Sequence, residues 1–309
     1  MGFKTKADQY GGRCKTNAIK FDMIKAIRKN HSLIDDILHA SKDEENFHIW
    51  WLGQSGYLLQ YKNIRILIDP YLSDSLTKKY ENTEKPHVRI SELVISPSEL
   101  PRIDYITSSH NHTDHLDAET IIPILKNNSG CKLIIPEANR SFVCERLHLE
   151  SNIPIGLDAG ESYDTPAFSI SAIPAAHNTI EKDEAGKCRF LGYMIRLGKW
   201  CIYHSGDTLL YDEMISLIKK HKPDLALLPI NGNDPARKVA GNLNSAEAVF
   251  LAKETNIPII IPCHYDLFEF NTVDVNEFIH VAQQENQRYC VLDLGGKFSS
   301  HEFHNQVIK

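Results

Sequence analysis

The segment SSHNHTDHLD, residues 108–117, follows the apolar stretch DYIT at 104–107 and carries the strongest chemical signal in the chain. It places three imidazoles and one carboxylate close together, at His110, His112, Asp114 and His115. Such nitrogen and oxygen ligands suit zinc, manganese or iron, and no thiolate is present to indicate a structural zinc site. An ordinary polar loop is the better explanation for any one of these residues. The four together predict a metal site at a strand end.

Three further candidate ligands end later apolar segments. His177 ends SISAIPAAH (169–177), Asp207 ends KWCIYHSGD (199–207), and His264 ends IPIIIPCH (257–264). A short loop supplies too few ligands for two ions, so side chains gathered at a common sheet edge would complete the site. A core or turn histidine remains the alternative for His177 or His264 taken singly.

Outward from these segments the chain divides into two similar halves, each with strands first and helices afterwards. This order predicts an α/β fold in which two sheets pack together with helices outside. No linker separates the halves, so we expect a helical N-terminal extension (1–45) and one domain (46–309). The expected strands are 47–51, 56–61, 64–69, 104–110, 132–136, 168–177, 189–197, 199–207, 224–230, 257–262 and 288–294, and the expected helices lie near 118–126, 137–148, 209–220, 245–254 and 274–284.

Local patterns add detail at three places. Apolar residues at helical spacing predict helix over 18–40, where Ser32 and Asp35 resemble a capping box that starts a second helix. Asn63 suits a tight hairpin turn, and 64–69 alternates like a half-buried strand. Residues 71–102 lack periodicity and contain three prolines, which indicates a long surface loop.

Composition limits the class of protein. Hydrophobic residues make up 42% and charged residues 24% of the 309 residues, close to the averages of about 45–50% and about 25% for folded domains. The net charge of −6 gives no general attraction for a polyanion, so we expect no nucleic-acid partner. The seven cysteines lack C-x-x-C spacing and are expected to be reduced and mostly buried. With no secretory signal and no apolar run of about 18 residues, we expect a cytoplasmic protein without a membrane partner.

The loop HNHTDHLD, followed by His177, SGD at 205–207 and His264, resembles the metallo-β-lactamase-fold hydrolase superfamily, whose signature is H-x-H-x-D-H and then a histidine, a bridging aspartate and a last histidine. The resemblance covers about residues 47–298. Within the superfamily the chain is similar to the L-ascorbate-6-phosphate lactonase-like group, which has counterparts in the same order of WWLGQSGYLL (50–59), IDPYLSD (68–74), YHSGDT (203–208), IPCHYD (261–266) and GGKF (295–298).

The resemblance implies a four-layer αβ/βα sandwich and two divalent metal ions. Zinc or manganese is expected, with iron as a further option. One ion would be held by His110, His112 and His177, the other by Asp114, His115 and His264, with Asp207 bridging both. Two ions about 3.5–4 Å apart share a water whose pKa falls toward about 7, and Asp114 would orient the resulting hydroxide as the catalytic carboxylate. Asp69, at the end of its strand, would support the histidine loop rather than bind metal.

Residues around the ligands have less certain roles. Gln54 lies in the WLGQSG turn as a substrate contact or an ordinary turn residue, and His204 is equally open to a structural or a functional role. The segment NGNDPARK (231–238) offers Asn231 and Arg237 to an anionic group such as phosphate, with a solvated loop as the alternative. Asn244 is expected to cap a helix, and Trp50 and Trp51 to pack in the core.

The leading hypothesis is a hydrolase that opens a lactone or similar ester of a small, anionic, sugar-acid substrate, which can be phosphorylated. Two departures leave the exact lactone open: the lactonases proper lack a histidine where this chain has His177, and this chain is shorter at 71–102. The alternatives are a phosphodiesterase of the same superfamily, such as a phospholipase D-like enzyme, and a metal-binding protein without turnover. The intact Asp114 argues against the last. Related lactonases form homo-oligomers, so the resemblance allows a homo-oligomer, while the sequence leaves the oligomeric state open.

Overall fold

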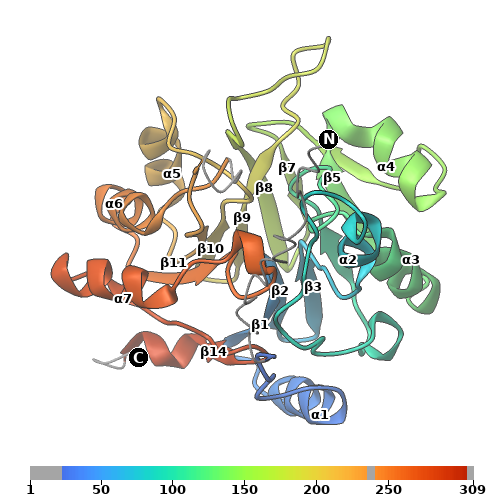
Figure 1. The fold of residues 1–309 in the computed structure, drawn as a ribbon, viewed down its shortest axis with the longest axis horizontal. Helices are drawn as coiled ribbons and strands as arrows, with labels where there is room; N and C mark the ends of the chain where they lie inside the picture. The colour runs from blue at the N-terminus through green and yellow to red at the C-terminus, as the bar shows by residue number, and fades with distance from the viewer. Residues whose placement is uncertain (1–22, 235–240, 305–309) are drawn as a thin grey trace, which may run out of the picture.

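The computed structural model describes residues 23–234 and 241–304. Within these ranges the strands form two seven-stranded sheets, and helices lie outside them (Figure 1). In the view of Figure 1, α2, α3 and α4 lie on the right and α5, α6 and α7 on the left, with the strands between them. This arrangement is the predicted four-layer αβ/βα sandwich, so the fold-class prediction is confirmed.

The first sheet has the order β14-β1-β2-β3-β4-β5-β6. The strands β14, β1, β2 and β3 pair antiparallel, and β3 to β6 pair parallel. Parallel neighbours place their carboxyl ends at one edge of the sheet. The bounds are β1 (Phe47–Gly53), β2 (Gly56–Tyr61), β3 (Ile64–Ile68), β4 (Tyr105–Thr107), β5 (Lys132–Pro136), β6 (Ile155–Leu157) and β14 (Lys297–Ser299).

The second sheet repeats this plan with the order β13-β12-β11-β10-β9-β8-β7. Here β7 to β10 pair antiparallel, whereas β10 to β13 pair parallel. The repeated plan explains the two similar halves of the sequence. The bounds are β7 (Ser162–Asp164), β8 (Phe168–Pro174), β9 (Leu191–Leu197), β10 (Trp200–His204), β11 (Leu225–Pro229), β12 (Ile259–Cys263) and β13 (Arg288–Tyr289).

Burial explains why the strands appear as apolar runs in the sequence. All residues of β1, β11 and β12 are buried, because each strand is covered on both faces. The expected alternation in 64–69 is wrong for the same reason, since the last three residues of β3 are all buried. Trp50 and Trp51 are buried as expected, and Trp51 stacks on Tyr265 with ring centroids 4.8 Å apart.

The helices are α1 (His31–Ala40), α2 (Ser75–Tyr80), α3 (Ala118–Asn127), α4 (Arg140–Leu147), α5 (Met214–His221), α6 (Ser245–Thr255) and α7 (Val275–Gln284), with 3-10 turns η1 (Pro97–Glu99), η2 (Glu137–Asn139), η3 (Glu269–Asn271) and η4 (Ser300–His304). Asn244 caps α6 as predicted, through a capping box with Glu247. None of the helices in the described ranges has the length and apolar character needed to cross a membrane.

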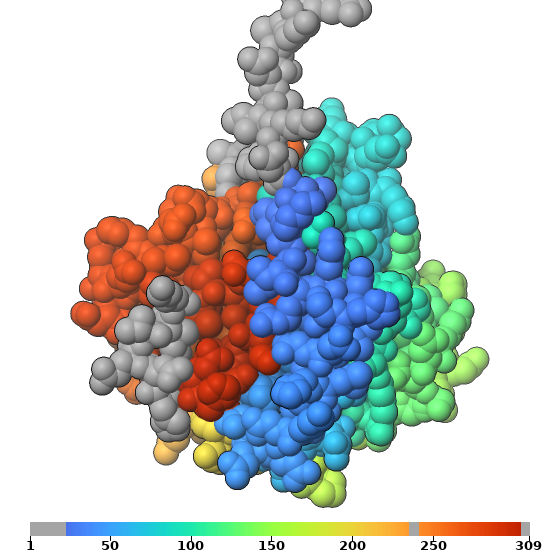
Figure 2. Space-filling view, turned by 90° about the horizontal axis from the view of Figure 1, so that it is seen from below, coloured from blue at the N-terminus to red at the C-terminus, as the bar shows by residue number. Residues whose placement is uncertain are grey.

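The N-terminal part differs from its prediction. The described residues before α1 are not helical, and residues 18–22 lie outside the described ranges. Helix α1 begins at His31, so Ser32 is not its cap; the Ser32 hydroxyl instead bonds the Lys29 carbonyl at 2.8 Å. Residues 23–30 are irregular rather than helical because their backbone bonds other segments, as Ile27 N–H does to Leu294 O at 2.9 Å. Figure 2 shows this N-terminal part beside the C-terminal part of the chain.

Residues 71–102 are not simply a surface loop. They contain α2 and η1, and several of their apolar side chains are buried, including Tyr71 and Leu76. Tyr71 and Leu76 form a small apolar cluster with Leu267 and Phe268, which follow β12. The prediction failed because the partner residues are distant in the sequence.

Two further boundaries differ from the prediction. Helix α5 begins at Met214 rather than near 209, because Leu209 N–H bonds Ala176 O at 2.8 Å and holds the chain beside the end of β8. The strand expected at 288–294 ends at Tyr289. The chain then passes to the first sheet, where Gly295 N–H bonds Trp51 O at 3.0 Å before β14 begins.

Candidate metal site

The predicted ligands follow the carboxyl ends of strands in both sheets. The 108–115 segment follows β4, Asp207 lies three residues after β10, and His264 comes directly after β12. His177 lies three residues after β8. Because parallel strands end at a common edge, and the two sheets pack face to face, these side chains converge.

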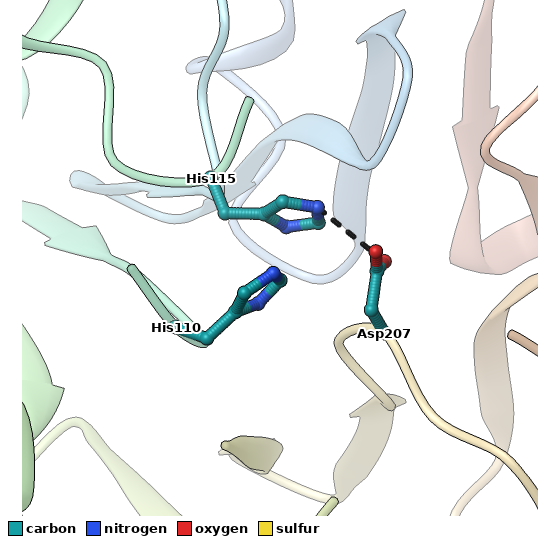
Figure 3. Close-up of side chains that lie close together, drawn as sticks. All are labelled: His110, His115 and Asp207. Carbon is teal, nitrogen blue, oxygen red and sulfur yellow. Dashed lines mark ion pairs between the residues drawn. The ribbon is translucent and has the colours of Figure 1, made fainter. Parts of the chain in front are cut away.

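The part of the chain that the structure describes contains two sets of side chains that could each hold a metal ion. Within each set, the possible ligand atoms all lie within 4.8 Å of one another. One set is His110, His115 and Asp207, and the other is Asp114, His115 and His264. Asp207 connects them, since its Oδ1 lies 3.3 Å from His115 Nε2 and its Oδ2 lies 3.2 Å from His264 Nε2. Figure 3 shows the His115 ring facing the Asp207 carboxylate, with the His110 ring beside it.

The structure fixes which histidine nitrogens face the centre. His115 Nδ1–H donates to Asp69 Oδ2 at 2.6 Å, and His177 Nδ1–H donates to Gly241 O at 3.2 Å. In both rings this leaves the Nε2 lone pair for a cation, as is usual for metal-binding histidines. Asp69 also accepts hydrogen bonds from Ser109 N–H at 2.8 Å and from the Ser109 hydroxyl.

The donor set fits divalent metal ions. His110 Nε2, His115 Nε2 and Asp207 Oδ1 are buried atoms without a hydrogen-bond partner. Buried polar groups are normally paired, but His110 Nε2 has no partner, and His115 Nε2 and Asp207 Oδ1 contact each other only as an ion pair, 3.3 Å apart. These three atoms at one place call for a ligand. Neutral imidazole and carboxylate are suitable ligands for zinc, manganese and iron.

The electrostatics of the centre favour a cation. Burial lowers the pKa of His115, but the Asp207 and Asp114 carboxylates outweigh it and raise that pKa well above its usual value. Burial raises the pKa of Asp207, yet His115 and His264 bring it well below its usual value. Burial lowers the pKa of His110 well below its usual value, with His115 and His112 acting in the same direction. The centre therefore combines ionised carboxylates with a neutral imidazole at His110 and a protonated one at His115, whose Nε2 proton a metal ion would replace.

The predicted division of ligands between two ions is reproduced only in part. Asp114, His115 and His264 form a set as expected, whereas His110 groups with His115 and Asp207. The His112 and His177 rings lie 4.8 Å apart and within 5.6 Å of the His110 ring, measured between centroids. Among the described residues, neither set includes His112 or His177. Their role as ligands stays a prediction.

Backbone geometry places the Gln54 side chain beside the candidate ligands. Its Nε2 donates to Asp114 Oδ2 at 2.8 Å, and its carbonyl accepts from His264 N–H at 3.1 Å. Gln54, Asp69 and His264 have positive φ values of 52°, 41° and 64°. Left-handed non-glycine residues are uncommon and cluster at functional sites. Gln54 thus holds Asp114 in place, and it is not among the residues that line the pocket.

His204 and Asn231, also predicted as site residues, are both buried outside the pocket lining. His204 is buried, its Nδ1 has no hydrogen-bond partner, and it packs against Tyr57 with ring centroids 6.4 Å apart. Asn231 is buried and donates from Nδ2 to Asn271 Oδ1 at 2.8 Å. Neither lines the pocket, although Asn271 does. Arg237 lies outside the described residues.

The metal site opens into a pocket of about 430 Å³. One wall is aromatic: the His87 ring stacks on Tyr80 with centroids 4.2 Å apart and contacts Phe268 and Phe270 edge-on. Three cationic side chains also line the pocket: Lys79, Lys85 and Arg146. The ligands in the lining are His112, Asp114, His177, Asp207 and His264. The pocket therefore suits a small anionic molecule whose reactive group faces the metal site.

Several residues of the site were not predicted from the sequence. Ser109 could have been predicted, because it lies inside the histidine motif. Gly241, which accepts from His177, and the aromatic wall carried no local signal. Their roles depend on contacts between segments far apart in the chain.

Comparison with known proteins agrees with this geometry. The family described as "Beta-lactamase superfamily domain" matches residues 64–265. A UPF0173 metal-dependent hydrolase from Archaeoglobus fulgidus is 29% identical over 235 residues, which cover 74% of this chain and 88% of that protein. One from Methanosarcina mazei is 29% identical over 236 residues, with coverages of 74% and 88%.

Solved structures share the fold. An isothiocyanate hydrolase from Delia radicum gut bacteria superposes with a TM-score of 0.66 at 16% identity, covering 81% of this chain and 98% of that one. The metallo hydrolase Igni18 from Ignicoccus hospitalis gives a TM-score of 0.60 at 21% identity, with coverages of 82% and 98%. At these identities the likeness concerns the fold alone.

Proposed function

The chain belongs to the beta-lactamase superfamily, and on this premise we propose that it is a metal-dependent hydrolase that opens a lactone or similar ester of a small anionic substrate, such as a sugar acid with or without phosphate. The convergence of unpaired histidine and aspartate atoms at the floor of an open pocket carries the proposal. The curated relatives named metal-dependent hydrolases support the reaction class.

The ligand set would hold two divalent ions, zinc or manganese or, as a further option, iron. His110, His115 and Asp207 offer one group of ligand atoms, and Asp114, His115 and His264 the other. His112 and His177 would complete the first. When bound, such ions stabilise negative charge on oxygen and lower the pKa of water.

Asp114 is the proposed catalytic carboxylate. Its Oδ2 accepts from Gln54 and lies 3.7 Å from both His115 Nε2 and His264 Nε2. The carboxylate also lines the pocket, so it can accept a proton or hydrogen bond from the attacking water. Gln54 keeps it oriented, because the Gln54 turn is itself bonded to His264.

The pocket walls would select the substrate. Lys79, Lys85 and Arg146 supply positive charge for a carboxylate or phosphate group. Arg146 is held in place because its Nη1 donates to Asn111 O at 2.7 Å and to Leu116 O at 3.2 Å. A negatively charged substrate can therefore be attracted locally even though the whole chain carries a net charge of −6.

The test combines metal analysis with a lactone panel. We expect bound metal by elemental analysis of the purified protein and lactone ring opening that is lost with a chelator. Asp114→Asn should lower turnover by about 100-fold or more, since general-base catalysis contributes about 10²–10⁴-fold. Asp212→Asn, at an exposed aspartate outside the pocket, is the control.

Three outcomes would contradict the proposal. Metal content near zero would remove its basis, and unchanged turnover in Asp114→Asn would refute the catalytic role. Cleavage of bis-p-nitrophenyl phosphate without lactone turnover would assign the site to phosphodiester hydrolysis instead.

A further inference from the structure

Asn242 is a buried amide with no partner. Its side chain is 0% exposed, and neither Nδ2 nor Oδ1 has a hydrogen-bond partner. Asn242 also lines the pocket together with His177, Asp207 and His264. Leaving both ends of a buried amide unpaired is unfavourable for folding, so the residue is better explained by a ligand than by stability.

The backbone around Asn242 fixes its position. The carbonyl of the preceding Gly241 accepts from His177 Nδ1, and Leu243 O accepts from Gly232 N–H at 3.0 Å. Asn244 then caps α6. Asn242 is therefore held on an anchored turn between a predicted metal ligand and a helix, as a positioning residue for substrate requires.

A second unpaired amide atom lines the same pocket. Asn111 Oδ1 is buried and has no hydrogen-bond partner, and Asn111 lies inside the histidine motif. Two residues of the pocket lining thus carry neutral amide atoms without partners, in addition to the three cationic side chains and the aromatic wall. The cations suit an anionic group, but the amides call for a different part of the substrate.

We propose that Asn242 determines substrate specificity by binding a hydroxyl group next to the scissile ester. A hydroxyl is the smallest neutral group that can accept from Nδ2 and donate to Oδ1 at once, whereas a carboxylate can only accept. The inference rests on the proposed function and narrows its substrate class to hydroxylated lactones and esters. A site that pairs with a substrate hydroxyl rejects the analogue that lacks it, by factors up to about 10⁴–10⁵.

The experiment compares D-glucono-δ-lactone with δ-valerolactone, which has the same ring without hydroxyls. In the metal-loaded wild type we expect kcat/KM to favour the hydroxylated lactone by about 100-fold or more. Asn242→Leu should reduce this preference at least tenfold by lowering kcat/KM for D-glucono-δ-lactone, with the metal content unchanged. An unchanged preference in Asn242→Leu, or no preference in the wild type, overturns the inference.

Thermal stability distinguishes a role of Asn242 in substrate binding from a structural role. Because Asn242→Leu replaces an unpaired amide with an apolar group of similar size, its Tm should equal or exceed that of the wild type; a fall in Tm with an unchanged preference would assign a structural role. Asn139 is a control, since it is also buried but donates to Arg189 O at 2.8 Å and lies outside the pocket lining. Asn139→Leu should lower Tm and leave the preference unchanged. Asn242→Ser, which is shorter, provides a second variant should the leucine disturb folding.

A binding measurement distinguishes this inference from the proposed function. If neither lactone is hydrolysed, the lactonase proposal fails, and the product acids D-gluconate and 5-hydroxypentanoate are titrated into metal-loaded protein by calorimetry. The Asn242 inference then stands if D-gluconate binds the wild type at least tenfold more tightly than it binds Asn242→Leu. Equal affinity, or no binding to the wild type, overturns it.

Discussion

Buried polar atoms at the metal site are of two kinds. The carboxylate oxygens of Asp69 and the Nδ1 of His115 are paired with one another or with Ser109, which fixes the ring orientation. His110 Nε2, His115 Nε2 and Asp207 Oδ1 have no hydrogen-bond partner, although the last two form an ion pair at 3.3 Å. Each unpaired buried group costs about 1–3 kcal/mol, so the fold is less stable at this place than it would be with a fully paired network. Function explains that cost, because a bound cation pairs with the same atoms.

Gly241 is the residue whose replacement tests how His177 is held. It has φ +85°, and a Cβ added there would lie 1.8 Å from His177 Nδ1 and 2.1 Å from His177 O. We therefore expect Gly241→Ala to displace His177, lower the metal content per chain and reduce stability by about 1–3 kcal/mol, as strained backbone does. Elemental analysis and thermal unfolding measure the two effects.

Gly160 provides a matched control for Gly241. Its φ is +88°, so an alanine meets similar backbone strain, but nothing lies within 4 Å of the added Cβ. Gly160→Ala should lose stability and keep its metal. If the two variants bind metal equally, Gly241 has no role in placing His177.

At the level of single residues, the sequence predicted what depends on local pattern. The candidate ligands were found because each follows an apolar segment, and the structure brings them together. The two sets of ligand atoms were not predicted, because they depend on how two sheets pack. Gly241 was missed because its contact with His177 spans 64 residues.

Among the elements, α2 shows most clearly that contacts between distant segments are not predicted from local sequence pattern. Most strands and helices were predicted from periodicity, although the short strands β6, β7 and β14 were not. Helix α2 is only six residues long, and its apolar side chains pack against residues after β12. Its contribution to the pocket follows from this packing. Leu76, Lys79 and Tyr80 line the pocket from α2, and Phe268 and Phe270 do so from the segment after β12.

The aromatic wall should select for flat substrates. The centroid of the Phe270 ring lies 4.5 Å from the centroid of the His87 ring and 4.3 Å from Lys85 Nζ. We expect Phe270→Ala to raise KM for dihydrocoumarin by about tenfold, since such aromatic contacts contribute about 0.5–1.5 kcal/mol. The kcat value, and both constants for δ-valerolactone, should change less than threefold.

The control for the aromatic wall is Phe250→Ala. Phe250 is 48% exposed on α6 and lies outside the pocket lining, so its removal should leave both substrates unaffected. Steady-state kinetics with dihydrocoumarin and δ-valerolactone measure whether Phe270 contributes to the binding of flat substrates. A common loss of kcat on both substrates after Phe270→Ala would mean that the wall supports the catalytic residues rather than the substrate.

In the whole molecule, the irregular segment 23–30 joins distant parts of the chain. Its backbone bonds Ile90 and Val94 on one side and Leu294 on the other, and Ile90 N–H bonds Leu267 O at 2.9 Å. Phe268 and Phe270 line the pocket, so the segment is linked through Ile90 and Leu267 to the pocket wall. A helix over residues 23–30 would have lacked these bonds, which explains why the irregular form is favoured.

Glu92 provides the test of this attachment. It accepts from Ala26 N–H at 3.1 Å and pairs with Lys29 at 2.9 Å and Lys25 at 3.1 Å. The Lys29 hydrogen bond, followed by those from Ala26 and Lys25, lowers the pKa of Glu92 to about 2. A carboxylate whose pKa is lower in the folded state stabilises the fold above its ordinary pKa of about 4.3, and this contribution is lost as pH falls toward 2.

Glu92→Gln should therefore lower Tm at pH 7 by a few degrees at most, because the ion pairs are partly exposed and such pairs are weak. The difference in Tm from the wild type should stay constant from pH 7 to about pH 5 and shrink as pH falls below about 4.5. Thermal unfolding followed by circular dichroism at several pH values measures it, with Glu99→Gln as the control at an exposed glutamate. A difference that persists unchanged at pH 3.5 would show that Glu92 stabilises the attachment without its charge, through hydrogen bonds that glutamine does not form.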